Sequence, residues 1–443
     1  MKKIVLLLVL SLSASGFLQS QNFNKAKMDS LFDAIDAHQK AMCSITISKN
    51  GKVVYARAIG SSVIDGKQKT PATINTEYRI GSITKMFTTT IIFQLIEEGK
   101  LSLATHLSDF FPKLPNADKI TIENLLYHRS GLHNFTDDSL YLTWNTQPKT
   151  ESEMLDIIGS HAPDFQPNEK TAYSNSNFVV LGYIIEKICG NSYSDILKQR
   201  ITSKIGLTQT YCGGKTDFKK GEALSYNFEK DIWTQEAETD MSIPGGAGCI
   251  VSTPTDLCKF IDALFTGKLV RAKSLKQMET IKDGMGAGMF KFPFYEKTAY
   301  GHTGGIDAFQ SELTYFPIDS VSVAFCGNGM AMPMNDIAIG FMSIYYNKSY
   351  SIPEFKTVTL TEKDLEKYLG NYSSEQMPLK IIISKDGNAL MAQASGQSAF
   401  PLEATEINVF EFQQAGIVME FHPEKNEFTL KQAGGKYLFV KDK

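Results

Sequence analysis

The pattern of hydrophobic and polar positions near the start of the chain predicts one helix followed by a strand pair. An amphipathic run covers residues 25–38, and two alternating runs follow at residues 44–48 and 53–58. Asn50 and Gly51 lie between the alternating runs, and Asn-Gly favours a tight hairpin turn because both central positions of that turn need positive φ. We therefore expect an antiparallel hairpin after the first helix.

The first twenty residues show a different pattern. Lys2 and Lys3 precede a short apolar run at residues 4–10, and small residues follow at positions 13–16. A basic start, a short apolar stretch and small residues are typical of a cleaved secretory signal, and so short a stretch does not comfortably span a bilayer. We expect residues 1–20 to be a signal peptide. The mature protein would be periplasmic or secreted, without a stable membrane span.

Near residue 82 the pattern changes from extended to helical. Apolar residues recur at spacings of three and four between Ile83 and Ile96 and surround most of the predicted helix, as expected for a helix buried in a core. Ser82 would lie at the first turn, with Lys85 one turn later on the same face. The free N–H groups of a helix start could also stabilise an oxyanion.

The second half of the chain predicts more strands. Alternating runs at residues 310–316 and 321–325 indicate a hairpin, and a helix is expected at about residues 335–346. Residues 351–361 form a polar linker, and residues 362–443 carry six short alternating runs separated by turn signals. This last region therefore predicts a small β-barrel or sandwich as a separate domain.

Composition narrows the classes of function. The 443 residues are 42% hydrophobic and carry a formal net charge of -3, which suits an ordinary globular protein of two or three domains. No Lys/Arg-rich run is present, so nucleic acid is not expected as a partner. The six cysteines and seven histidines lack the paired spacings of metal ligands. We expect mostly buried free cysteines with room for one disulfide, no metal site and no cofactor.

Three short segments contain residue types that together fit covalent catalysis by a serine. They are Ser82-Ile83-Thr84-Lys85, Tyr173-Ser174-Asn175 and His302-Thr303-Gly304-Gly305. Each alone has an ordinary explanation, such as a helix cap with a solvated lysine or a turn between strands. Together they could supply a nucleophile, a base, a second acid/base group and oxyanion donors.

The chemistry of the individual side chains supports this interpretation. Burial would disfavour the charged form of Lys85 and lower its pKa toward ~7 to 8, where a lysine can act as a base. The phenol of Tyr173 could shuttle a proton, and the amide of Asn175 could bind a substrate amide. Gly304 and Gly305 would let a strand backbone approach a bound ligand closely.

The order of these segments resembles the penicillin-recognising serine hydrolases, in the branch of class C β-lactamases, D-Ala-D-Ala carboxypeptidases, D-aminopeptidases and related esterases. Three further segments share the resemblance: Tyr78-Arg79-Ile80-Gly81, the Leu-Leu-Tyr-His-Arg-Ser-Gly-Leu run at residues 125–132, and Gly245-Gly246-Ala247-Gly248. The resemblance implies an α/β (α+β) hydrolase domain at residues 21–350, with a mainly antiparallel sheet flanked by helices and an α-rich insertion. Leu369-Gly370-Asn371-Tyr372 resembles the opening of lipocalin-like domains appended to this family.

The resemblance also implies a role for each matching residue. Ser82 would be the acylated nucleophile, Lys85 its base partner and Tyr173 the shared acid/base. The remaining implied positions are Asn175, His302, Thr303 and Gly304 as substrate-binding residues, the backbone N–H groups of Ser82 and Gly305 as the oxyanion hole, and His128 as a structural residue. The implied partner is a small peptide, amide or ester, including peptidoglycan-derived ones.

One position departs from the β-lactamase pattern. Penicillin-binding proteins and β-lactamases usually have lysine where this chain has His302, and a mostly neutral imidazole would attract a substrate carboxylate less strongly. We therefore favour a carboxypeptidase, aminopeptidase or esterase over a class C-type β-lactamase. A penicillin-binding or cell-wall-sensing protein without turnover remains the alternative outside the enzymes.

Overall fold

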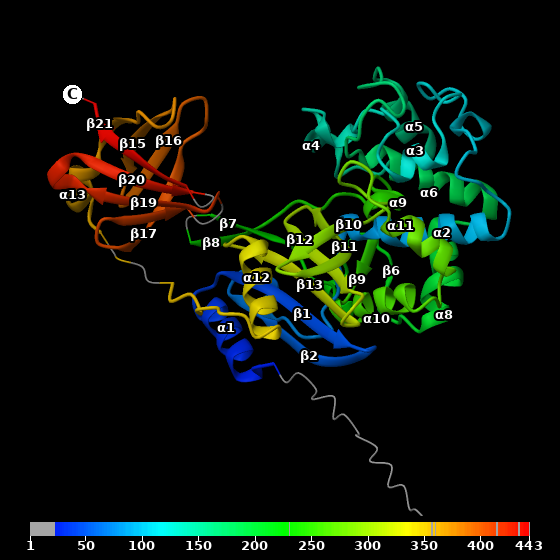
Figure 1. The fold of residues 1–443 in the computed structure, drawn as a ribbon, viewed down its shortest axis with the longest axis horizontal. Helices are drawn as coiled ribbons and strands as arrows, with labels where there is room; N and C mark the ends of the chain where they lie inside the picture. Colours follow the sequence, from blue (N-terminus) through cyan, green and yellow to red (C-terminus); the bar gives the residue numbers. More distant parts are fainter. Residues whose placement is uncertain are drawn as a thin grey trace, which may run out of the picture.

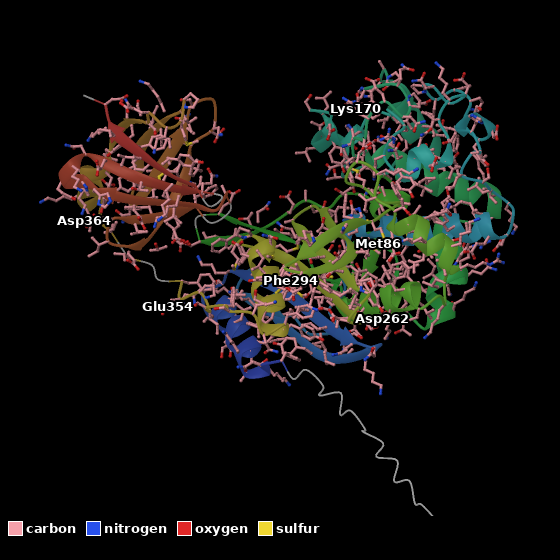
Figure 2. The ribbon with its side chains drawn as sticks, in the orientation of Figure 1. Met86, Lys170, Asp262, Phe294, Glu354 and Asp364 are labelled. Atoms are coloured by element: carbon pink, nitrogen blue, oxygen red, sulfur yellow. A yellow bond between two sulfur atoms is a disulfide. The ribbon has the colours of Figure 1, made fainter. Side chains whose placement is uncertain are left out.

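The computed structural model describes residues 23–442 apart from residues 230, 356, 357, 359, 413, 414, 433 and 434. The predicted signal peptide at residues 1–20 lies outside the described residues. A large α/β unit and a small β-barrel make up the fold (Figure 1). Asp262 and Phe294 belong to the α/β unit, whereas Asp364 belongs to the barrel (Figure 2).

The centre of the α/β unit is a mainly antiparallel sheet whose main strands follow the order β10-β11-β12-β13-β1-β2. Their bounds are β1 (Ala41–Lys49), β2 (Lys52–Ile59), β10 (Phe290–Phe294), β11 (Lys297–Ile306), β12 (Phe309–Phe316) and β13 (Val321–Met330). The predicted Asn50-Gly51 hairpin is present: Lys49 pairs with Lys52, and both turn residues have positive φ. At the side of β13, β7 (Tyr226–Glu229) pairs in parallel and β8 (Ile232–Gln235) pairs with β7.

Helices bury both faces of this sheet. The alternation of side chains along β13 shows the two layers, since Val323 and Phe325 pack into one core and Ala324 and Cys326 into the other. The first core contains the apolar sides of α1 (Lys25–Ala37) and α12 (Met334–Tyr345), and the second contains α2 (Thr84–Glu97) and α10 (Pro254–Phe265). Because both faces of β13 are covered, nearly every residue of this strand is buried.

The α-rich insertion predicted between the Ser82 helix and His302 is present. Its helices are α3 (Ile122–Leu126), α4 (Tyr141–Trp144), α5 (Glu151–Gly159), α6 (Asn175–Cys189), α7 (Tyr193–Leu197), α8 (Ser203–Ile205), α9 (Gly245–Gly248) and α11 (Ala272–Glu279). Short strands complete the unit: β3 (Ser61–Asp65) pairs with β4 (Gln68–Pro71), and β9 (Ile250–Ser252) lies between β5 (Tyr78–Arg79) and β6 (Tyr211–Cys212). The expected fold class is thus confirmed.

The C-terminal strands close into an eight-stranded antiparallel barrel, because β14 pairs with both β15 and β21. The strands are β14 (Gly370–Ser373), β15 (Lys380–Asp386), β16 (Ala389–Ala394), β17 (Phe400–Glu406), β18 (Val409–Phe412), β19 (Ile417–His422), β20 (Glu427–Gln432) and β21 (Gly435–Lys441), preceded by α13 (Glu362–Leu365). Along β19 buried residues alternate with partly exposed ones, as expected for a strand with one face in a core. Of the two expected architectures, the barrel is the one observed.

A salt bridge joins the two units. The Nζ atom of Lys40 lies 3.0 Å from Oε1 of Glu403 on β17, and the backbone N–H of Val358 donates to the carbonyl of Ala404 at 2.8 Å. α12 ends at Tyr345 and α13 begins at Glu362, so the predicted linker runs between regular elements. Among the described residues, no helix is both long and apolar enough to cross a membrane.

Candidate active site

The turn that carries Ser82 packs directly against strand β11. Ser82 lies in a 3-10 turn, Gly81–Ile83, immediately before α2. Gly81 has a φ of +49°, and a Cβ atom at this position would lie 2.8 Å from the carbonyl oxygen of Gly305. Only glycine permits both this conformation and this approach. As a result, the backbone around Ser82 and the backbone of Gly305 face one pocket.

The Lys85 amine is the buried centre of the site. Its Nζ lies 2.8 Å from Oγ of Ser82, 2.8 Å from Oδ1 of Asn175 and 2.9 Å from the carbonyl oxygen of Ala247. Its side chain is 0% exposed, and burial lowers the pKa of Lys85 well below its usual value. The two carbonyl oxygens can only accept hydrogen bonds. In a neutral amine they take up the two N–H groups, which leaves the nitrogen lone pair for the hydroxyl proton of Ser82.

Tyr173 lies on the other side of Ser82. Its phenol has a side-chain hydrogen bond with Ser82, and burial raises the pKa of Tyr173 above its usual value despite that bond. The Tyr173 hydroxyl therefore carries its proton at neutral pH. The Nζ atom of Lys85 lies 5.0 Å from the centre of the Tyr173 ring. The chain thus brings together a hydroxyl nucleophile, a neutral amine and a protonated phenol from two segments far apart in the sequence.

The ring of His128 packs against the ring of Tyr173. The two rings stack with centroids 4.5 Å apart, and Nδ1 of His128 accepts a hydrogen bond from the backbone N–H of Ser174 at 3.1 Å. Burial lowers the pKa of His128 well below its usual value, with the charge of Lys85 as the second cause. A neutral ring that accepts at Nδ1 carries its proton on Nε2. These contacts fit the structural role that we expected for His128.

Asn175 begins α6 and is held on both sides of its amide. Oδ1 accepts from Lys85, Nδ2 donates to Oγ1 of Thr136 at 3.0 Å, and the backbone N–H donates to Oδ1 of Asn134 at 2.9 Å. Asn175 also lines the pocket beside Ser82. In this arrangement its amide orients Lys85, in addition to the contact with a substrate amide that the resemblance implies.

The β11 residues do not all face the same cavity. His302 is buried, its ring lies 4.6 Å from that of Phe290, and burial together with the charge of Lys85 lowers the pKa of His302 to about 3. Gly304 lies against the backbone of Ile80, where a Cβ atom would lie 2.0 Å from the carbonyl oxygen. From the end of β11, Gly305 and Ile306 line the pocket with Ser82, together with Asp307 directly after the strand.

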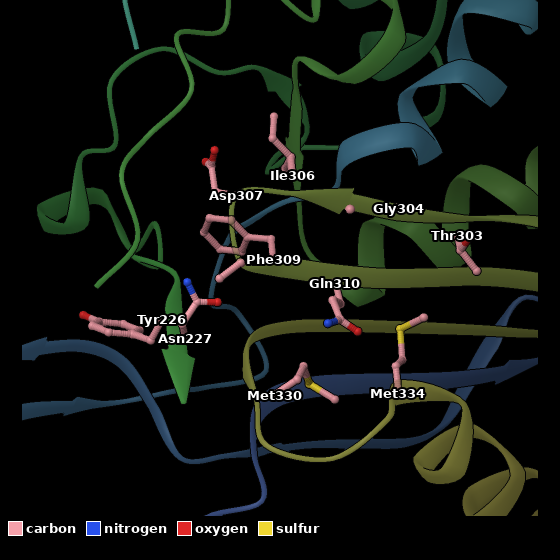
Figure 3. Close-up of a pocket in the computed structure, with 12 residues that line it drawn as sticks. Tyr226, Asn227, Thr303, Gly304, Ile306, Asp307, Phe309, Gln310, Met330 and Met334 are labelled. Carbon is pink, nitrogen blue, oxygen red and sulfur yellow. The ribbon is translucent and has the colours of Figure 1, made fainter. Parts of the chain in front are cut away.

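Thr303 faces a second cavity, of about 610 Å³ (Figure 3). Gln310, Met330 and Met334 also line that cavity, and Ser82 is not among its lining residues. The alternation of side chains along a strand explains the separation, since His302 and Thr303 are adjacent and point to opposite faces. The structure therefore brings His302 close to Lys85 and Tyr173, but it places Thr303 elsewhere.

The pocket beside Ser82 has a volume of about 420 Å³. Phe135, Tyr141 and Leu142 form an apolar side, and Glu236 and Asp307 add two carboxylates. No motif marks these five residues in the sequence: Tyr141 and Leu142 lie in the short helix α4, and the other three lie in turns or loops. Only their position in the tertiary structure reveals them.

The two carboxylates have different partners. Asp307 lies 3.0 Å from the guanidinium of Arg79, which is almost fully buried and also contacts Glu238 at 2.7 Å. Glu236 accepts hydrogen bonds from the Nδ2 group of Asn227 and the backbone N–H of Ala237, without a cation. Within the described residues, Glu236 is thus the pocket carboxylate that has no cationic partner.

The glycine-rich turn is fixed from two sides. α9 presents the carbonyl of Ala247 to Lys85, and a Cβ atom on Gly246 would lie 2.7 Å from the carbonyl oxygen of Phe178 in α6. A disulfide joins Cys249, directly after the turn, to Cys212 on β6. Cys43, Cys258 and Cys326 are buried free thiols and Cys189 is partly exposed, which agrees with the expected cysteine usage.

Comparison with known proteins places this site in a family. A family model described as Beta-lactamase matches residues 28–340. The putative penicillin-binding protein PbpX of Bacillus subtilis (strain 168) is 30% identical over 234 residues, which are 53% of this chain and 57% of that protein. Teichoic acid D-alanine hydrolase of Staphylococcus aureus is 27% identical over 231 residues, 52% of this chain and 56% of the hydrolase. The chain thus matches just over half the length of these two relatives.

A solved structure covers more of the chain. D-amino acid amidase from Ochrobactrum anthropi SV3, complexed with D-phenylalanine, is 25% identical and has a TM-score of 0.62. The alignment covers 72% of this chain and 99% of the amidase. The likeness therefore extends over nearly the whole of that enzyme.

Proposed function

The chain belongs to the beta-lactamase family, and we propose that within it the protein is a serine hydrolase that acts through an acyl-enzyme on a small amide or ester. This proposal rests mainly on the buried amine of Lys85, which lies 2.8 Å from Oγ of Ser82. Burial lowers the pKa of this amine. A neutral lysine at this distance is a general base for the hydroxyl.

The geometry supports the following sequence. Lys85 takes the Ser82 hydroxyl proton while Oγ attacks the substrate carbonyl carbon and its oxygen becomes an oxyanion. The backbone N–H groups of Ser82 and Gly305 stabilise that oxyanion. As the tetrahedral intermediate collapses, Tyr173 donates its proton to the leaving nitrogen or oxygen and regains one from the Lys85 ammonium. A water molecule then attacks the acyl-Ser82 ester, and the same groups return the proton to Oγ.

We propose a D-aminoacyl group as the acyl part of the substrate. The carboxylate of Glu236, which has no cationic partner among the described residues, suits a substrate ammonium, and Phe135 and Leu142 offer apolar surface for a side chain. Two of the similar proteins carry names that refer to D-alanine and D-amino acids. A D-Ala-D-Ala carboxypeptidase, a D-aminopeptidase and an esterase all remain within this proposal, and peptidoglycan-derived peptides are included among its substrates.

β-Lactam hydrolysis is the second candidate within the enzymes. The neutral state of His302 disfavours it, because a group whose pKa is about 3 offers no positive charge to the carboxylate of a β-lactam. We also propose that the protein is exported. The signal-like first twenty residues support export, and so does the Cys212–Cys249 disulfide, since oxidising compartments favour such bonds.

The test compares the purified mature protein with its Ser82→Ala variant on matched substrates. We would measure release of p-nitroaniline from D-alanine p-nitroanilide and its L-enantiomer, of p-nitrophenol from p-nitrophenyl acetate, and opening of a chromogenic cephalosporin. The expected result is Ser82-dependent turnover that is fastest for the D-aminoacyl substrate, with a transient acyl adduct by intact mass. Full activity in Ser82→Ala would disprove the proposal. A stable penicillin adduct without turnover of any substrate would instead support the binding or sensing alternative.

A further inference from the structure

We propose that His133, Asp138 and His161 form a binding site for a divalent transition metal, with Zn²⁺ as the best fit. The Nε2 atom of His133 lies 3.1 Å from Oδ1 of Asp138, and Nε2 of His161 lies 3.2 Å from Oδ2 of the same carboxylate. The three ligand atoms lie within 4.8 Å of one another. Two imidazole nitrogens and one carboxylate therefore converge on one point, outside the pocket of Ser82.

The spacing of these atoms suits a small metal ion. Zn²⁺ binds imidazole and carboxylate at about 2.0–2.2 Å in a tetrahedron, whose edges are then about 3.3–3.6 Å long. The two measured contacts are close to that edge length. Two nitrogens and one oxygen suit Zn²⁺ and related transition metals, whereas Mg²⁺ and Ca²⁺ prefer oxygen ligands. Because all three side chains are partly exposed, the ion could reach the site from solvent and keep a water ligand.

A fourth side chain fixes the orientation of His133. Its Nδ1 atom lies 2.9 Å from Oδ1 of Asp164. Without metal, Nε2 donates to Asp138; when an ion binds, the Asp164 contact would keep the ring proton on Nδ1 and leave the Nε2 lone pair for the ion. The rings of His133 and His161 also stack, with centroids 4.4 Å apart and planes 21° from parallel. A carboxylate behind a histidine ligand is the usual support of a protein zinc site.

The two loops that carry these residues are held together by their backbones. The backbone N–H of Asp164 donates to the carbonyl of Gly131 at 2.9 Å. A Cβ atom on Gly131 would lie 2.0 Å from the carbonyl oxygen of Phe165, so only glycine allows this approach. The ligands are thus placed before any ion binds.

The proposed metal site borders the segment that forms one wall of the Ser82 pocket. The carbonyl of His133 accepts from Oγ of Ser176 at 2.5 Å, and Thr136 accepts from the amide of Asn175. Phe135 and Thr136 themselves line the pocket. A bound ion would therefore fix the residues that hold the amide of Asn175. The sequence did not reveal this site, because 28 residues separate the two histidines.

The experiment uses the full mature chain, carrying no polyhistidine tag and treated with a chelator. ZnCl₂ is titrated by calorimetry, and CoCl₂ is titrated while the visible spectrum is recorded. The variants are His161→Ala, Asp164→Asn and, as a matched control, His106→Ala, which removes an exposed histidine elsewhere. We expect one Zn²⁺ per chain, at least 10-fold weaker binding in His161→Ala, a loss of about 10- to 100-fold in Asp164→Asn, and no change in His106→Ala.

Further readouts separate the proposed site from surface binding and from misfolding. At Co²⁺ concentrations near the wild-type Kd, the visible bands of a four-coordinate site should be strongest in the wild type and in His106→Ala, and excess Ca²⁺ should not displace Co²⁺. Zn²⁺ should raise the melting temperature of those two proteins more than that of either site variant. Equal affinity in wild type and His161→Ala, no saturable binding by the wild type, or displacement by Ca²⁺ would overturn the proposal. Asp164→Asn keeps the test valid if His161→Ala does not fold, because it changes one partly exposed side chain by a single group.

Discussion

The Nζ atom of Lys85 lies 2.8 Å from the Oγ atom of Ser82, in surroundings that give the amine only neutral partners. No ion pair involves Lys85 in the part of the chain that the structure describes. A buried amine without a carboxylate loses its proton readily, since nothing compensates for the lost hydration of the charged form. Lys85, which as an exposed residue would be a cation, can therefore act as a base toward the hydroxyl of Ser82.

The first prediction concerns the dependence of activity on pH. The base must be unprotonated, so kcat/KM should rise with pH through the pKa of Lys85 in the free enzyme. Because that pKa lies well below its usual value, the rise should be complete well before pH ~10.4, the ordinary lysine value. Lys85→Ala should lose about 10²–10⁴-fold in kcat/KM. Lys204→Ala, on the short helix α8, is the control, and a rise centred near pH 10 would contradict the prediction.

The second prediction uses the leaving group to isolate the role of Tyr173. A p-nitrophenolate leaves without a proton, whereas an amine must be protonated as it departs. Tyr173→Phe should therefore lose about 10²–10⁴-fold on an amide substrate and much less on the p-nitrophenyl ester of the same acyl group. The ratio of the two kcat/KM values is the measurement. Equal losses on both substrates would assign Tyr173 to positioning alone.

The third prediction concerns the disulfide beside the glycine-rich turn. Cys212 and Cys249 are 37 residues apart in sequence, and a crosslink over a loop of that length stabilises a fold by about 2–4 kcal/mol. A Cys212→Ala/Cys249→Ala variant should unfold at a correspondingly lower urea concentration. It should also lose activity, because α9 presents the carbonyl of Ala247 to Lys85.

The control for that variant is Cys189→Ala, which removes a free and partly exposed thiol. Its urea midpoint should equal that of the wild type. If the double variant matched the wild type as well, the crosslink would have no role in stability.

The fourth prediction concerns Glu312, on β12. Burial raises its pKa to about 7, and within the described residues it has no ion-pair partner. The folded protein then holds a proton that the unfolded chain releases near pH ~4.3, so stability falls as pH rises from about 4 to about 7 and is level above that range. Glu312→Gln, which cannot ionise, should be more stable than the wild type by about 1–3 kcal/mol at pH 8 and equally stable at pH 4.

Urea unfolding at the two pH values measures this difference. Glu375→Gln, at an exposed position of the barrel domain, should leave stability unchanged at both. A Glu312→Gln variant that is no more stable than the wild type at pH 8 would show that Glu312 ionises freely in the fold.

Local patterns of the chain were enough to predict several elements. The Asn50-Gly51 hairpin follows from the φ requirement of its turn, and the placement of Ser82 and Lys85 one turn apart follows from helix geometry. The alternating runs of the last eighty residues predicted an all-β domain, but not whether it was a barrel or a sandwich. That choice depended on the pairing of β14 with β21, a contact between strands far apart in the chain.

In the active site too, some features follow from local sequence and others only from the tertiary structure. The sequence by itself determined which residue types were available and which neighbours share a helix face, because periodicity fixes local geometry. Only the tertiary structure decided that His302 lies neutral beside Lys85 while Thr303 faces another cavity, that Glu236 enters the pocket, and that His133 meets His161. Burial and long-range packing set these outcomes. They depend on the whole folded chain, and no local pattern encodes them.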